Sequence, residues 1–416
     1  MELNDSGSGW HRFRKHATWM RRLFLREEDD RWMKDDVFDR LLAGSQVGLV
    51  CPALCLFTCY FTRANQRFIP HFLSPHLTHF AIRVRPSYRN IPRDLLPNPT
   101  HILQVLPTSC LQEISIDLDP NGLYRLEDEV ASMIQRFGQA LRVLRVPVPL
   151  GEAAVHHVVG FKNLRVWTNV CDPPPSTLPL STNFPPLRTL TLRKDAYGWI
   201  PWLAQRERAI SDVQGGPVGN VGLKATLTHL RFREWAPVDP AFISLLSLFQ
   251  NLAILFVQSN CAGPVGCAFS LTNQDLAQLS AALPRLEVLE LGRPCPTNTS
   301  LTTVPCLLAL SVHCKSLSSL CIHLNTTDLI GDIQSLSEDP GLRDLGSLPT
   351  RCRLVTFKAG RLPFPHLTSD EDITTIAAGL VGIFPSLINV SFFGSGWVPL
   401  LSRVRELQGV PELASP

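Results

Sequence analysis

A short apolar pattern recurs along almost the whole chain, and it constrains the fold more than any other feature of the sequence. In each copy an apolar residue is followed by two variable residues, a second apolar residue, one variable residue and a third apolar residue. Clear copies begin at Leu77, Leu111, Leu141, Leu187, Leu227, Leu252, Leu286, Leu317, Leu354 and Leu387. Weaker copies begin at Met20, Leu54 and Leu164. Successive copies start about 31 residues apart on average, and such a period is typical of solenoids built from stacked repeats.

The pattern has a simple physical interpretation as a strand. Alternate residues of a strand face opposite sides, so the fourth and sixth positions of each copy should point into the core. The first position turns inward where the strand begins. One copy alone cannot bury this ridge, but stacked copies bury it continuously. The third, fifth and seventh positions should line the opposite face of the sheet.

The segments between the copies favour helices. Residues 123–140, 272–283 and 369–384 carry apolar residues at helical spacing. The last two begin at Thr272 and Ser369, each followed by acidic residues, as expected at a helix start. Helix, short turn and strand in repeated succession predict an α/β solenoid with irregular repeats. Its parallel sheet should form the concave face and its helices the convex face.

The extent of the pattern predicts three segments. Residues 1–17 form a polar lead-in, residues 18–397 form one right-handed solenoid, and residues 398–416 form a C-terminal cap helix and tail. Parallel strand crossovers are right-handed in nearly all proteins, and this bias predicts the hand of the solenoid.

Charge and hydropathy argue against nucleic-acid and membrane partners. The net charge of +3 over 416 residues is too weak a bias to imply a nucleic-acid partner, for which a concentrated basic face would be expected. Residues 46–61, QVGLVCPALCLFTCYF, are uncharged, but a spanning helix needs about 20 apolar residues and this run contains a proline. We therefore expect a buried strand there, with no membrane segment and no nucleic-acid partner.

The cysteines and the first residues favour an intracellular location, cytoplasmic or nuclear. The twelve cysteines are scattered and form no CxxC pair, so we expect buried free thiols in a reducing compartment. The opening residues MELNDSGSG lack the basic-then-apolar order of a secretory signal.

No motif in the sequence predicts catalysis, a metal site or a cofactor. His156 and His157 are adjacent in an expected helix, so they point about 100° apart and chelate one metal poorly. The spacing of His313, Cys314, Cys321 and His323 matches no usual zinc site. The stretch QGGPVGNVG fits neither phosphate-loop pattern, and FFGSGW is no nucleophile elbow. We expect no enzyme.

The sheet positions that face away from the core predict a partner site. In three successive copies they place Arg193, His229, Arg231, Arg233 and Phe256 on one face, and we expect all of them to be solvent-exposed. Arginines beside an aromatic ring can recognise an acidic protein segment. An ordinary solvated sheet face is the alternative interpretation.

The strand starts FPPLRTLTL, LPRLEVLEL and FPSLINVSF resemble leucine-rich repeats. The stretches WHRFRKHATWMRRLFL and RFIPHFLSPHLTHFAI resemble the region just beyond the F-box in fungal, mushroom-type F-box proteins. The resemblance covers residues 10–397. It implies the substrate-recognition part of a ubiquitin-ligase subunit that binds a partner protein still to be identified.

An F-box itself is not expected in this sequence, because only nine residues precede Trp10. A Skp-type adaptor is thus an expected partner only if an F-box is encoded upstream. The alternative is a scaffold or decoy of the same fold that binds without a role in ubiquitination.

Overall fold

The structure is a computed structural model in which two compact units are described. The described residues are 15–25, 49–61, 66–84, 99–117, 127–146, 150–170, 184–193, 196–212, 222–233, 238–258, 270–292, 301–338, 352–359, 369–392 and 398–410. The first unit holds those up to Leu187 and the second those from Arg188 onward. Because each unit is described by itself, one continuous solenoid over residues 18–397 stays a prediction.

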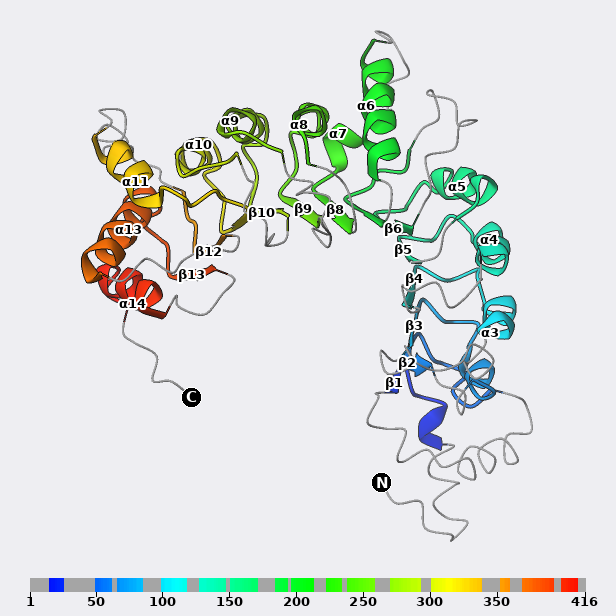
Figure 1. Ribbon diagram of the computed structural model, residues 1–416. Coiled ribbons are helices and arrows are strands. Elements are labelled where there is room, and N and C mark those ends of the chain that lie inside the picture. The colour runs from blue at the N-terminus through cyan, green and yellow to red at the C-terminus, as the bar shows by residue number, and fades with distance from the viewer. Residues whose placement is uncertain are drawn as a thin grey trace, which may run out of the picture. The chain divides into compact units, whose positions relative to one another are not determined.

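The first unit contains a parallel sheet whose described strands pair in chain order (Figure 1). The strands are β1 (Arg22–Leu25), β2 (Leu56–Phe61), β3 (His79–Val84), β4 (Glu113–Asp117), β5 (Val143–Arg145) and β6 (Val166–Val170). Its helices are η2 (Ile69–Phe72), α3 (Thr100–Val105), α4 (Glu127–Gln135) and α5 (Glu152–Val159). These helices lie on one face of the sheet.

The second unit repeats this arrangement, with strands again paired in chain order and all parallel. The strands are β7 (Thr189–Arg193), β8 (His229–Arg233), β9 (Ile254–Gln258), β10 (Val288–Leu291), β11 (Ser319–Ile322), β12 (Thr356–Ala359) and β13 (Asn389–Phe392). The helices are α6 (Ala196–Asp212), α7 (Leu223–Thr226), α8 (Pro240–Leu246), α9 (Asn273–Ala282), α10 (Pro305–His313), α11 (Leu329–Glu338), α13 (Asp370–Ile383) and α14 (Val398–Leu407). Parallel strands alternating with helices confirm the predicted α/β class.

The core lies between the sheet and the helices of each unit, where the repeated pattern places it. Every first, fourth and sixth position of the ten clear copies whose side chain is described is at most 4% exposed. The weaker copy at Leu54 is buried as deeply, with Phe57 and Cys59 fully inside. In the copy at Leu164, Trp167 is fully buried, and β6 continues through Asn169. The predicted strand register is therefore confirmed.

The predicted helix starts are also present. The Thr272 hydroxyl accepts the backbone N–H of Asp275, whose carboxylate accepts the N–H of Thr272, which makes a capping box at the start of α9. Ser369 accepts the N–H of Asp372 in the same way before α13. Both caps satisfy backbone donors that lack a partner within the helix. The helix expected at 123–140 is described as α4, over Glu127–Gln135.

The apolar run at residues 46–61 ends in strand β2, as the sequence predicts. Within the described ranges, no helix combines the length and the apolar character needed to cross a bilayer.

Candidate functional site

Each unit leaves the second face of its sheet free of described helices (Figure 1). On that face, side chains from neighbouring strands form rows across the sheet, because the strands are parallel and in register. These rows contain polar and aromatic side chains that could contact a bound partner.

The register in the second unit brings the predicted partner-site positions together. Arg231 in β8 is paired with Phe256 in β9, and Arg193 in β7 is paired with Arg233. The neighbour relations expected from the sequence are thus present in the backbone. The side chains of Arg193 and Arg233 lie outside the described part of the structure.

The exposure of this predicted patch differs from the expectation. His229, Arg231 and Phe256 are half-buried instead of freely exposed, and the adjacent Thr191 is only 7% exposed. Strands lie about 4.8 Å apart, so large side chains in one row cover each other. The Arg231 Nε is buried and has no hydrogen-bond partner among the described residues.

The pKa of His229 depends on the charges on the same face. Its Nδ1 lies 2.8 Å from the hydroxyl oxygen of Thr228. Burial lowers the pKa of His229, the positive charge of Arg231 lowers it further, and the carboxylate of Glu287 opposes both effects. A neutral imidazole beside a guanidinium is therefore favoured here.

Replacing Arg231 by glutamine should raise the pKa of His229, because a positive charge that disfavours the imidazolium is removed. The imidazole C–H resonances followed by NMR against pH would measure the change. Glu287→Gln should move the same pKa downward, which makes it a control of opposite sign. An unchanged His229 pKa in Arg231→Gln would contradict the placement of the two side chains on one face.

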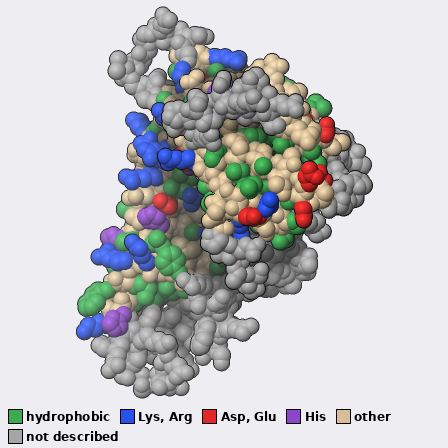
Figure 2. All heavy atoms as spheres, turned by 90° about the vertical axis from the view of Figure 1, so that its left-hand side faces the viewer, with side chains coloured by type: hydrophobic (Ala, Val, Ile, Leu, Met, Phe, Trp, Pro, Cys, Tyr) green, Lys and Arg blue, Asp and Glu red, His purple; other side chains and the backbone are tan. Residues whose placement is uncertain are grey.

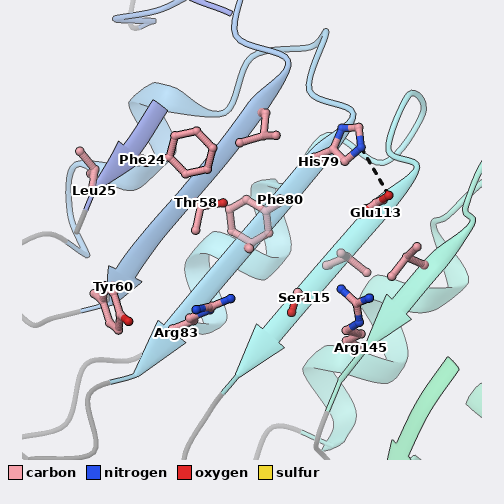
Figure 3. Close-up of a pocket in the computed structure, with 14 residues that line it drawn as sticks. Phe24, Leu25, Thr58, Tyr60, His79, Phe80, Arg83, Glu113, Ser115 and Arg145 are labelled. Carbon is pink, nitrogen blue, oxygen red and sulfur yellow. Dashed lines mark ion pairs between the residues drawn. The ribbon is translucent and has the colours of Figure 1, made fainter. Parts of the chain in front are cut away.

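The first unit carries a hollow of about 690 Å³ on its helix-free face (Figure 3). It is lined by Phe24, Leu25, Leu56, Thr58, Tyr60, His79, Phe80, Ala81, Arg83, Glu113, Ile114, Ser115, Val143 and Arg145. Sequence reasoning missed this site. The sequence pattern that could have revealed it lies in the first five copies. At their positions facing away from the core, small residues are flanked by aromatic residues and arginines.

The charges around this hollow are only partly paired. His79 Nε2 lies 3.5 Å from a carboxylate oxygen of Glu113. Arg83 and Arg145 are exposed, and neither makes an ion pair with any described residue. Asp117 is paired with Arg83 in the strand register but is also exposed and makes no ion pair of its own within the described ranges.

Charged side chains of both signs lie on the strands of the first unit, with Glu113 and Asp117 on β4 among them. Other described acidic residues lie at the starts of α4 and α5, on the helix side, where the positive end of the helix dipole stabilises their negative charge. Six exposed arginines lie on or beside the strands: Arg21, Arg22, Arg83, Arg142, Arg145 and Arg165. Two others, Arg67 and Arg136, are exposed next to η2 and α4. Figure 2, which draws both units from one direction, shows blue Lys and Arg side chains mostly at the left of the view and red Asp and Glu side chains mostly at the right.

Cys314 and Cys321, two of the residues considered as metal ligands from the sequence, have thiols with raised pKa values. The Cys314 thiol lies 3.7 Å from the carbonyl oxygen of Ser280, and burial raises its pKa to about 12. Burial likewise raises the pKa of Cys321 to about 12. Both thiols are therefore protonated at neutral pH. Across the described residues, no three His, Cys, Asp or Glu side chains are placed to hold a metal ion.

The structure describes only part of the remaining motifs, which are the adjacent histidines, the glycine-rich stretch and FFGSGW. His157 lies on α5 and packs edge-on against Phe161, with ring centroids 5.1 Å apart. The glycine-rich stretch QGGPVGNVG lies outside the described residues except for Gly222, and so does most of FFGSGW.

No family model and no curated protein matches this chain. The resemblance to leucine-rich repeats and to F-box proteins therefore rests on the sequence motifs alone.

Proposed function

We propose that this chain is a protein-interaction module, a leucine-rich-repeat solenoid with irregular repeats that binds a partner protein on its sheet faces. The sheet forms the concave face of the solenoid and the helices form the convex face. One observation carries the proposal: half-buried polar, charged and aromatic side chains line sheet faces that no described helix covers. Solenoids commonly bind partners on such surfaces.

The partner class follows from the chemistry of these faces. Arginine guanidinium groups beside aromatic rings suit carboxylates presented by a protein, and aromatic residues and arginine dominate binding energy at protein interfaces. We find no arrangement among the described residues that activates a nucleophile or holds a metal, so binding rather than catalysis is proposed.

The sequence resemblance extends the proposal to a biological role. The chain acts inside the cell, in the cytoplasm or nucleus, as the substrate-recognition part of an F-box ubiquitin-ligase subunit. A Skp-type adaptor joins it only where an F-box is encoded upstream, and otherwise the chain is a scaffold or decoy. Capture of a Skp adaptor by the chain separates these two roles.

Reversing charge on the predicted patch should remove the partner. Arg231→Glu combined with Arg233→Glu places two carboxylates where an acidic partner segment would lie, and like charges in an interface are strongly unfavourable. Affinity purification of both forms followed by mass spectrometry measures the partner set. The free energy of unfolding should stay within about 1 kcal/mol, because both positions alternate with the buried core residues Leu230 and Phe232 along β8.

A matched control carries the same change of charge away from the sheet face. Arg208 on α6 and Arg285 in the turn before β10 are both exposed, and their double replacement by glutamate should leave the partner set unchanged. If Arg231→Glu with Arg233→Glu retains the same partners as the wild type, the patch on β7 to β9 is not the binding site.

A further inference from the structure

The hollow of the first unit is organised by a middle row of side chains that crosses five strands. The strand register aligns Phe24, Thr58, Ala81, Ser115 and Arg145, taken from β1 to β5 in order. The row therefore has an aromatic residue at one end, three small residues in the middle and an arginine at the other end.

The three small residues create the depression. Thr58, Ala81 and Ser115 are half-buried on the helix-free face, while the larger neighbours Phe24 and Arg145 project beside them. Figure 3 shows these residues together, with Tyr60 below Thr58 and with Arg83 and Arg145 on either side of Ser115. The result is a shallow channel that crosses the strands.

The two ends of the channel differ in chemistry. Phe24, on β1 at one end, is 55% exposed, a high value for a phenylalanine. Tyr60 also lines the hollow, on β2 two residues beyond Thr58, the register partner of Phe24. At the other end stands Arg145 on β5, and Arg83 lies beside the middle of the channel on β3, where it is the register partner of Tyr60. Neither guanidinium group makes an ion pair among the described residues. The Glu113 carboxylate in the adjacent row is already engaged by His79.

The length of the row sets the size of a ligand that can occupy it. Four steps between neighbouring strands, at about 4.8 Å each, span roughly 19 Å. An extended polypeptide covers about 3.3 Å per residue, so roughly six residues would fill the channel.

We propose that this channel binds an extended acidic segment of a partner protein, about six residues long, which crosses strands β1 to β5. An apolar side chain of the segment packs against Phe24, its backbone lies over Ala81 and Ser115, and its carboxylates pair with Arg83 and Arg145. Arginine binds carboxylates in a bidentate manner, so Arg83 at the middle of the channel and Arg145 at its end would give the site its specificity. The inference rests on the proposed function, because it names the class of partner and a second place where it docks.

A protein segment fits this site better than a nucleic acid. Binding to a phosphate backbone depends on many basic contacts, whereas only two arginines face the channel and the exposed Asp117 lies beside them. Isolated arginines next to an aromatic platform suit a ligand that carries few charges and one apolar group.

The experiment selects ligands with the full-length protein from a phage library of random heptapeptides. The expected result is enrichment of sequences with Asp or Glu several residues away from an aromatic or aliphatic residue. A fluorescein-labelled copy of the most enriched heptapeptide is then titrated by fluorescence anisotropy. Its affinity should fall with increasing salt, because the pairing groups are exposed.

Three variants test the channel itself. Arg83→Glu with Arg145→Glu should weaken the selected peptide by roughly a hundredfold, since two favourable pairs become repulsive. Ala81→Trp fills the channel without any change of charge and should weaken the peptide at least about tenfold, because it blocks the path of the backbone. Arg231→Glu with Arg233→Glu, on the second unit, should leave peptide binding unchanged. Circular dichroism verifies that each variant is folded.

The outcomes separate this inference from the proposed function. If selection yields no acidic preference, or if the channel variants bind the peptide as the wild type does, the channel is not the site. The proposed function still stands in that case if Arg231→Glu with Arg233→Glu loses the partners that the wild type captures in affinity purification. Displacement of the peptide by single-stranded poly(U) at low micromolar concentration would overturn the inference in favour of a nucleic-acid ligand.

Discussion

Replacing Leu289 by aspartate should destabilise the second unit by at least about 3 kcal/mol, because it places an unpaired charge in the core. Leu289 is fully buried in β10, and its register neighbours are Leu255 in β9 and Leu320 in β11. Both neighbours are fully buried as well. A carboxylate at this position would find no partner in the apolar ridge that these strands share.

Limited proteolysis and urea unfolding followed by circular dichroism would measure the effect. In stacked repeats each repeat supports mainly its neighbours, so cleavage should begin near β10 and spread from there. Ser319→Asp is a matched control: it introduces the same side chain in the adjacent strand, on the half-buried sheet face. Equal protease resistance of Leu289→Asp and the wild type would mean that the strand register is wrong.

The strand register and the core could be predicted because both depend on a local rule. Alternation in a strand sends fixed positions of each copy to one side, whatever the neighbouring copies contain. The copy at Leu54 illustrates this, since Cys59 stands where leucine or isoleucine is more usual and is nevertheless fully buried. The helix caps at Thr272 and Ser369 follow from equally local chemistry.

The candidate sites could be predicted only in part, because exposure depends on side chains from several strands. The sequence places Arg231 beside Phe256, and the register has them paired. Their half-burial follows from crowding within the row, which a single copy does not reveal. The channel in the first unit required the alignment of five strands whose starts are separated by unequal spacers, and no single copy contains it.

Phe57→Ala should destabilise the first unit by about 3–5 kcal/mol, the usual cost of removing a buried aromatic ring. Phe57 in β2 is fully buried, and its ring stacks on Phe72 and Phe80 at centroid distances of 5.7 and 6.1 Å. Truncation would remove both stacking contacts and leave a cavity between the sheet and η2. Urea unfolding of the variant and the wild type under the same conditions measures the loss.

Phe24→Ala is the matched control, because it removes the same ring from the neighbouring strand on the opposite face. Phe24 is 55% exposed, so its loss should change the free energy of unfolding by no more than about 0.5 kcal/mol. The two variants should also differ in binding. Phe24→Ala should weaken the peptide selected for the channel about tenfold or more, since it removes the apolar end of the site. A stability loss in Phe24→Ala as large as that in Phe57→Ala would show that Phe24 belongs to the core and that the channel has no aromatic end.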